Sequence, residues 1–110
     1  MISVVIPTLN AEAGLASCLT ALVTATVEGL VREVIIVDGG SSDRTLVIAE
    51  QAGATIIRAG AGRGTQLQAG ADAARFPWLL FLHADTVLET GWERDAAGFM
   101  ERVDLGHRPE

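Results

Sequence analysis

The apolar residues of this chain form two patterns. Some stand in short unbroken runs, and others recur at helical spacing over longer segments. The runs are rich in Val, Ile and Leu, which is typical of strands buried on both faces of a parallel sheet. We expect strands at 3–7, 33–38, 54–58 and 78–82. The segments between and after them predict helices over 11–27, 43–52, 65–75 and 90–103. Because the connections are too long for hairpins, the predicted fold is α/β, with a mostly parallel sheet and flanking helices.

Several residues are expected to mark the ends of these elements. Pro7 closes the first strand because proline has no N–H to donate to a sheet. Asn10 is a candidate N-cap for the helix that follows, and Gly29 is expected to end that helix. Thr90 and Glu93 have the spacing of a capping box at the start of the last helix.

The charged residues exclude some functions. The net charge of −6 argues against a protein that binds nucleic acid through a basic face. All eight basic residues are arginines, so the chain offers neither a Schiff-base lysine nor a P-loop lysine. An acidic chain can still bind a single nucleotide, particularly if its carboxylates recruit a divalent cation.

The apolar pattern predicts no transmembrane segment, because its runs are only about five residues long and a spanning helix needs roughly 20. The first residues lack the basic and apolar regions of a secretory signal, and we expect a cytoplasmic protein. Cys18 is the only cysteine and shares the helical spacing of Leu15 and Leu22, so we expect it to pack in the core.

The length is that of one domain, and we treat 1–110 as a single domain. The loop at 60–64 is expected to be flexible, and the tail at 106–110 is expected to be frayed. No further strand follows the last predicted helix. Two explanations stay open: the chain is the N-terminal portion of a larger protein, or it completes its sheet by association into a homo-oligomer.

Polar residues follow three of the predicted strands, in the segments 7–12, 38–43 and 83–85. Because parallel strands point the same way, these segments should share one edge of the sheet, where ligands of open α/β sheets bind. Asp38 is placed to accept hydrogen bonds from a base or a ribose, and Gly39 permits close approach of the backbone to a ligand. No Gly-x-Gly-x-x-Gly follows the first strand, which argues against a dinucleotide site.

Each of these residues also has a purely structural interpretation. Asp38 and Asp85 could cap loops or turns, and Glu12 could simply favour the start of a helix. His83 could be an ordinary strand-end histidine instead of a ligand, and Arg63 a loop residue instead of a clamp for a diphosphate.

Four ordered stretches resemble the nucleotide-sugar-binding half of the family 2 inverting glycosyltransferases, which have the GT-A fold. They are Val4–Glu12, Glu33–Thr45, Gly62–Gly64 and Leu80–Thr86. The subgroup that the chain is most similar to carries His-Ala-Asp-Thr at its metal motif, as residues 83–86 do here. The resemblance covers roughly residues 2–90, and its four blocks are more specific than any single motif.

The resemblance implies a site for the donor nucleotide and its phosphates. The residues at matching positions are Pro7, Thr8, Asn10, Glu12, Asp38, Gly39, Asp43, Arg63 and Gln68. It also implies that Asp85, the last acid of an Asp-x-Asp motif, holds Mg²⁺ or Mn²⁺ against the diphosphate. The chain departs from the family pattern at His83, which replaces the first acid, and at Gly39, where many relatives have a second Asp. Gln68 stands where relatives often have Asn.

The expected function is therefore that of a glycosyltransferase donor-binding domain. It would bind a UDP- or GDP-linked sugar with a divalent metal, for inverting transfer to an acceptor that the sequence does not identify. The catalytic base is unassigned, because the acceptor-binding half of such enzymes is not in these residues. A non-catalytic nucleotide-binding or oligomerisation module is the alternative.

Overall fold

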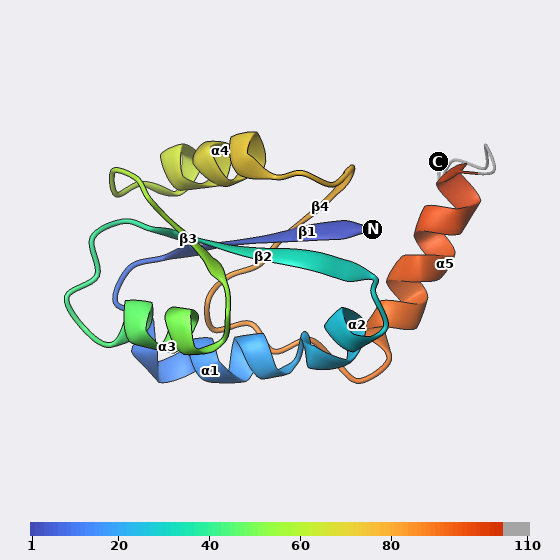
Figure 1. The fold of residues 1–110 in the computed structure, drawn as a ribbon, viewed down its shortest axis with the longest axis horizontal. Helices are drawn as coiled ribbons and strands as arrows, with labels where there is room; N and C mark the ends of the chain where they lie inside the picture. The colour runs from blue at the N-terminus through green and yellow to red at the C-terminus, as the bar shows by residue number, and fades with distance from the viewer. Residues whose placement is uncertain (105–110) are drawn as a thin grey trace.

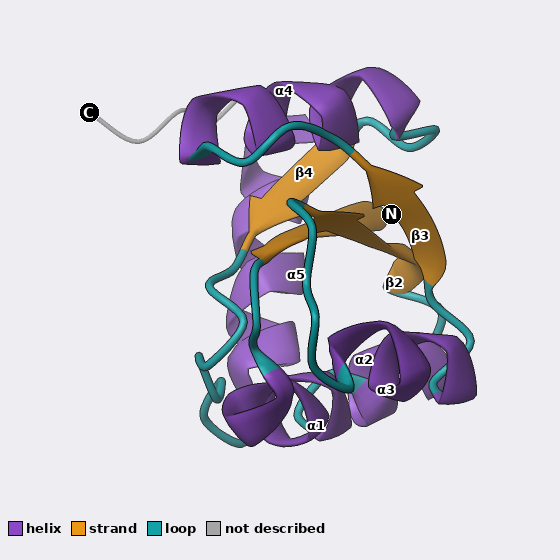
Figure 2. Cartoon of the chain, turned by 90° about the vertical axis from the view of Figure 1, so that its left-hand side faces the viewer, coloured by secondary structure: helices purple, strands orange, loops and turns teal. Residues whose placement is uncertain are grey.

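A computed structural model describes residues 1–104 as a four-stranded sheet with helices on both faces (Figures 1 and 2). The elements are β1 (Ile2–Thr8), α1 (Glu12–Thr20), α2 (Val23–Val27), β2 (Val31–Asp38), α3 (Thr45–Gln51), β3 (Thr55–Arg58), α4 (Arg63–Ala73), β4 (Trp78–Phe81) and α5 (Trp92–Asp104). Every strand pair is parallel, and the strand order is β3-β2-β1-β4. The predicted α/β class is confirmed. The tail that we expected to be frayed lies outside the described residues.

The helices form two layers around the sheet. Figure 2 shows α4 alone on one face and α1, α2 and α3 on the other. The main core lies under the three-helix layer and includes Val4, Ile6 and Leu15, whereas Val5 and Val37 face α4. Cys18 is buried in the main core, as predicted.

The chain changes direction across the sheet at β1. It leaves β1 for β2 and β3 on one side, and then returns through α4 to place β4 on the other side of β1. The carboxyl ends of β1 and β4 therefore flank the point where the strand order reverses. Ligands of open α/β sheets bind outside the carboxyl ends of the strands at such a point.

We had expected Pro7 to end the first strand, but β1 continues to Thr8. The backbone oxygen of Val5 accepts the N–H of Leu82, whereas that of Thr8 accepts the N–H of Gly39. The backbone N–H and C=O groups of alternate β1 residues thus point toward β4 and toward β2, and the backbone groups of Pro7 lie on the β4 side, like those of Val5. Since β4 has already ended at Phe81, no partner there requires the missing N–H of proline.

The single helix expected over 11–27 is also wrong, because the structure has two helices, α1 and α2. At the break, the N–H of Leu22 donates to the oxygen of Leu19, a tighter turn than an α-helical one. The second half is rich in β-branched residues, which have low helix propensity. Thr26 also directs its hydroxyl back to the oxygen of Leu22. Gly29 follows α2 with a φ of 81°, as expected of a helix-ending glycine.

Two further helix starts differ from the expected ones. α4 begins at Arg63, so residues 63 and 64 are helical and are not part of a flexible loop. α5 begins at Trp92, so Gly91 and not Thr90 precedes it, and Glu93 is its second residue instead of the third that the expected capping box requires.

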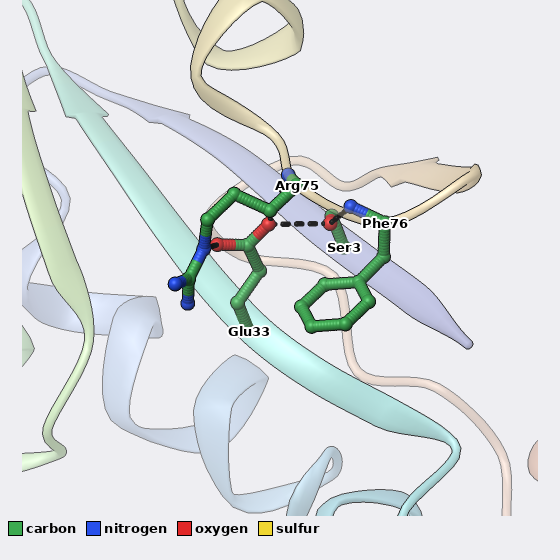
Figure 3. A network of polar contacts seen from close by, with 4 residues as sticks. All are labelled: Ser3, Glu33, Arg75 and Phe76. Atoms are coloured by element: carbon green, nitrogen blue, oxygen red, sulfur yellow. Dashed lines mark hydrogen bonds and ion pairs between the residues drawn. The ribbon is translucent and has the colours of Figure 1, made fainter.

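A partly buried polar cluster fixes the connection between α4 and β4 (Figure 3). The carboxylate of Glu33 accepts the hydroxyl of Ser3 at 2.6 Å and the N–H of Arg75 at 2.6 Å. The N–H of Phe76 in turn donates to the Ser3 oxygen at 3.3 Å. This cluster ties β1, β2 and the connection together at the end of the sheet opposite to the polar segments.

β4 is the edge strand on its side, with β1 as its only strand neighbour within residues 1–104. Leu79 and Phe81 are 39% and 46% exposed, and an apolar groove of about 310 Å³ lies between β4 and α5.

None of the helices described in residues 1–104 is long and apolar enough to cross a membrane. The cytoplasmic location stays a prediction.

Candidate functional site

The polar segments that follow β1, β2 and β4 share one edge of the sheet, as predicted. Thr8 lies opposite Asp38 in the register of β1 and β2, and the N–H of Leu82 reaches the oxygen of Val5 at 3.0 Å. The edge therefore brings together the first loop, the loop after Asp38 and the turn that contains His83 and Asp85.

Asp38 is almost completely buried, with 1% of its surface exposed. One carboxylate oxygen accepts the hydroxyls of Thr8 at 2.7 Å and Ser41 at 2.6 Å, and the other accepts the N–H groups of Gly40 at 3.0 Å and Ser41 at 2.8 Å. Burial alone would raise the pKa of Asp38, but the hydrogen bonds from Ser41, Thr8 and Gly40 outweigh it and hold the pKa below its usual range. All four bonds shape the loop that follows β2.

Asn10 joins the first loop to the second and does not cap a helix, which corrects our expectation. Ala11 precedes α1, and Asn10 has a φ of 51°, in the left-handed region that asparagine tolerates. Its side-chain oxygen accepts the N–H of Ser42 at 2.8 Å, and its own N–H donates to the hydroxyl of Ser41 at 2.8 Å. The sequence could not reveal this bond, because Ser42 is 32 residues away in the chain.

Glu12 and Asp43 form a reciprocal pair between the same two loops. The N–H of Glu12 donates to Asp43 at 3.1 Å, and the Glu12 carboxylate accepts the N–H of Arg44 at 3.3 Å. Asp43 also accepts the hydroxyl and the N–H of Thr45, and the hydroxyl bond is the main cause that lowers the pKa of Asp43. Each carboxylate thus satisfies a free N–H at the start of the other's helix.

Gln66 was missed in the sequence, yet it is the buried polar side chain that connects this edge to α4. Its amide nitrogen donates to the backbone oxygens of Thr8 at 3.0 Å and Val37 at 2.9 Å, and its amide oxygen accepts the N–H of Gly62 at 3.2 Å. The signal in the sequence is its spacing of one helical turn from Gly70. A methyl group at Gly70 would overlap a side-chain methyl of Val5, so the Gly70 face of α4 lies on the sheet.

Gly39 lies directly beneath Gln66. A Cβ at Gly39 would lie 3.2 Å from the amide nitrogen of Gln66 and 3.2 Å from the Cα of Ala61. The absence of a side chain therefore makes room for the Gln66 amide, which is the close approach expected of a glycine at this position, although here the neighbour is protein.

Arg63 and His83 meet at the surface of the edge. A terminal nitrogen of the Arg63 guanidinium lies 3.3 Å from Nδ1 of His83, and both side chains are exposed. Arginine cannot accept a hydrogen bond, so this contact requires Nδ1 to be the acceptor and the ring to carry its proton on Nε2.

Asp85 is exposed and follows β4 on a turn closed by the N–H of Thr86, which donates to the oxygen of His83 at 3.0 Å. The turn rests on α1, where the thiol of Cys18 lies 3.6 Å from the oxygen of His83. Burial, and to a smaller extent the charge of Asp85, raises the pKa of the Cys18 thiol to about 11. The Cys18 thiol is therefore uncharged and packs in the core, and it does not act as a nucleophile.

The residues present fit a metal that is shared with a ligand better than a metal held by protein alone. No cluster of three or more His, Cys, Asp or Glu side chains that could hold a metal ion occurs among residues 1–104. Mg²⁺ and Mn²⁺ are commonly bound by one or two carboxylates, with substrate phosphates and water completing the shell. Asp85, an exposed carboxylate at the edge, suits that arrangement.

Gln68 is the one predicted site residue that the structure does not bring to this group. It is exposed on α4, and its amide donates to Asp72 at 2.8 Å. The other predicted residues lie at the carboxyl ends of β1 and β2, on the loops that follow these strands up to the start of α1, at the start of α4 or on the turn after β4.

A parallel sheet of this order with acidic residues at its carboxyl edge places the chain among the open α/β domains that bind ligands there, and comparison with known proteins identifies the family. Residues 3–106 match the sequence profile described as Glycosyl transferase family 2, and the chain belongs to this family. The resemblance seen in the sequence is thereby confirmed.

The curated relatives are mycobacterial glycosyltransferases. The chain is 39% identical over 95 residues to the PGL/p-HBAD biosynthesis glycosyltransferase of Mycobacterium bovis (strain BCG / Pasteur 1173P2). The identity is the same with the protein of that name from Mycobacterium tuberculosis (strain ATCC 25177 / H37Ra). Each match covers 80% of this chain but only 36% of the relative, so the chain spans about a third of their length.

Solved structures of family 2 enzymes have the same GT-A fold. TarS 1-349 from S. aureus superposes with a TM-score of 0.82 at 26% identity, covering 92% of this chain and 32% of TarS. Glucosyl-3-phosphoglycerate synthase from Mycobacterium tuberculosis, solved with Mn²⁺, UDP and glucosyl-3-phosphoglycerate, gives a TM-score of 0.74 at 25% identity. That match covers 94% of this chain and 39% of the synthase. TarS has also been solved with UDP-GlcNAc.

Proposed function

We propose that this domain binds the donor of a glycosyl transfer, a nucleoside diphosphate sugar, together with a divalent cation. The observation that carries the proposal is the contact of Arg63 with His83, on the turn that also carries Asp85. This contact lies at the edge of the sheet where β2 ends at Asp38. A cationic guanidinium that contacts the turn carrying an exposed carboxylate suits a diphosphate that is neutralised from one side by arginine and from the other by a metal.

The two joined loops are assigned to the nucleoside. Pro7 and Thr8 at the end of β1, Asn10 on the first loop, and Gly39 and Asp43 on the second loop would line its pocket. Asp38 itself supports this pocket chiefly by shaping the second loop, because its oxygens already accept four hydrogen bonds from Thr8, Gly40 and Ser41. Glu12 acts in the same way, through its bond to the backbone of Arg44.

Asp85 would hold Mg²⁺ or Mn²⁺, with the diphosphate supplying further oxygen ligands. When bound, such a metal stabilises the charge of a departing nucleoside diphosphate as a Lewis acid. The hydrogen bond to Arg63 favours His83 as a partner that orients the guanidinium, in place of the metal-ligand role that its position implies.

In the complete reaction, the sugar would pass to the acceptor by a single in-line displacement with inversion at its anomeric carbon. None of the residues described here is assigned as the base that would activate the acceptor. The nucleotide is proposed to be UDP, because two of the similar solved structures contain UDP or UDP-GlcNAc, and GDP is the alternative.

Calorimetric titration tests the proposal directly. UDP and GDP are titrated into the protein with and without Mn²⁺, and UDP is expected to bind with metal-dependent affinity. Asp85→Ala should weaken that affinity at least about tenfold. Asp95→Ala removes a matched exposed carboxylate from α5, at the far end of the sheet, and should leave binding unchanged (Figure 1). Equal affinities for the wild type and Asp85→Ala would refute the assignment of Asp85.

A second candidate function is nucleotide binding without turnover. It is favoured by the β4 edge, which has β1 as its only strand neighbour within residues 1–104 and leaves Leu79 and Phe81 partly exposed, as a binding module that associates with a partner would. Incubation with UDP-GlcNAc and Mn²⁺, followed by measurement of released UDP, separates the two. Binding without any UDP release, beyond that of a blank without protein, would favour the second candidate for this chain.

A further inference from the structure

We infer that Gln66 is a positioning residue for the donor site, because it fixes the start of α4, and with it Arg63, to the carboxyl ends of β1 and β2. The inference rests on the proposed function, since Arg63 is there assigned to the diphosphate. Gln66 itself, 5% exposed, is placed to act through the backbone and not on the ligand.

The three hydrogen bonds of the Gln66 side chain join three separate segments. Two reach the carboxyl ends of β1 and β2, at the backbone oxygens of Thr8 and Val37. In the third, the amide oxygen of Gln66 accepts the N–H of Gly62. The bond to Gly62 is reciprocated, because the N–H of Gln66 donates to the oxygen of Gly62 at 2.9 Å. Gly62 is thus held from both of its polar backbone groups by one residue.

The start of α4 needs such a tie. Gly62, at the N-cap position, has no side chain that could cap the helix, and its φ of 139° is in a region that glycine populates easily. Gly60 and Gly64 flank it, and a Cβ at either would meet nothing within 4 Å. Three glycines within five residues, two of them with open space around them, offer little resistance to motion, so the bonds from Gln66 hold the start of the helix at Arg63 in place.

Gly39 makes room for the Gln66 side chain that holds the start of α4. The space that a side chain at Gly39 would fill is taken by the Gln66 amide, at 3.2 Å from the position of a Cβ. The second loop therefore supports the start of α4 through Gln66, although no hydrogen bond joins Gly39 to Arg63 directly.

The chain offers a matched control two residues away. Gln66→Met and Gln68→Met make the same chemical change on one helix, but Gln68 is exposed and contacts only Asp72 through its side-chain amide. Both variants are made in the 110-residue protein, their folding is checked by circular dichroism, and UDP binding is titrated with Mn²⁺. Gln66→Met should weaken binding about tenfold or more. Gln68→Met should change it by less than about twofold.

A double-mutant cycle separates positioning of Arg63 from a general loss of structure. If Gln66 acts through Arg63, the double variant Arg63→Ala/Gln66→Met binds UDP no more weakly than Arg63→Ala alone. Additive losses would overturn the inference, and so would a Gln66→Met protein that binds like the wild type.

Amide hydrogen exchange at Gly62 provides a readout that needs no ligand. In the unliganded wild type, the Gly62 N–H should exchange at least about tenfold more slowly than an open loop amide, and Gln66→Met should abolish this protection. An unprotected Gly62 amide in the wild type overturns the inference even if UDP binds. Absence of UDP binding with a protected Gly62 amide instead refutes the proposed function and shows that the tie itself exists.

Discussion

Gly14 on α1 packs directly against the backbone of Asp85. A Cβ at Gly14 would lie 3.0 Å from both the Cα and the Cβ of Asp85, and 3.6 Å from the oxygen of Ala84. One helical turn further along α1, the thiol of Cys18 contacts the oxygen of His83. The helix is therefore the surface on which the proposed metal-bearing turn rests, and a glycine at 14 is what permits the contact.

Gly14→Ala should disturb this turn. Alanine raises helix propensity by about 1 kcal/mol, but the new methyl would meet backbone, which cannot move aside like a flexible side chain. We expect a net loss of about 1–2 kcal/mol in the free energy of unfolding, with weaker Mn²⁺-dependent UDP binding. The control is Gly98→Ala in α5, where the new methyl would meet only the flexible end of Arg102 at 3.4 Å. Gly98→Ala should stabilise by about 0.5–1 kcal/mol in urea unfolding. A similar gain for Gly14→Ala would contradict the prediction.

Asp38→Ala should unfold the second loop and destabilise the whole domain. The substitution leaves the hydroxyl of Thr8 and the N–H and hydroxyl groups of the loop without their acceptor, at a cost of about 3 kcal/mol or more. Asp38→Asn keeps one acceptor oxygen and should lose less, about 1.5–3 kcal/mol. Ser42→Ala, which removes only a hydroxyl 3.4 Å from Asn10, should stay within about 0.5 kcal/mol of the wild type. Urea unfolding followed by circular dichroism orders the three variants, and an Asp38→Ala protein as stable as Ser42→Ala would disprove the role of Asp38.

The strands could be predicted from the sequence because a strand buried on both faces must be apolar throughout, as Val34–Val37 is. The position of the site followed from the same logic. Asp38 and Asp85 interrupt apolar runs where parallel strands end, and all such ends meet at one edge. These features depend only on local pattern and on the direction of the strands.

What the sequence could not reveal depends on contacts between distant segments. Asn10 looks like an N-cap until its partner Ser42 is known, and Gln66 looks like a polar residue of an Ala-rich helix until its bonds to the two strand ends are seen. The break between α1 and α2 was missed because helical spacing continues across it, whereas the backbone tightens at Leu22 to bury that side chain.

Cys18 should be unreactive in the folded protein. Its pKa of about 11 leaves very little thiolate at pH 8, whereas an unfolded cysteine titrates near its ordinary pKa of about 8.5. Reaction with Ellman's reagent should therefore be about 100-fold slower, or more, in buffer than in urea. The control is a Cys18→Ala/Ser17→Cys variant, whose thiol is on an exposed position of the same helix and should react in buffer. Equal rates for the two positions in folded protein would show that Cys18 is not buried as described.

Glu33 should make the stability of the domain depend on pH in the acidic range. Burial alone would raise its pKa, but bonds from the Ser3 hydroxyl and from the backbone and side chain of Arg75 lower the pKa of Glu33 below the ordinary value of 4.5 (Figure 3). The unfolded chain therefore takes up the proton first as the pH falls, so the contribution of Glu33 to stability is present above pH 4.5 and is lost below it.

Thermal unfolding between about pH 6 and pH 3 measures this dependence, since carboxylates titrate in that range. Glu33→Gln keeps the shape of the side chain but removes the titrating group, so the thermal midpoint should be lower at pH 6 and should fall less steeply toward pH 3. The slope should not vanish, because the pKa values of Asp38 and Asp43 are also lowered. Glu101→Gln, at an exposed position on α5, should retain the wild-type slope. A Glu33→Gln protein with the same acid dependence as Glu101→Gln would mean that the link between α4 and β4 does not depend on the charge of Glu33.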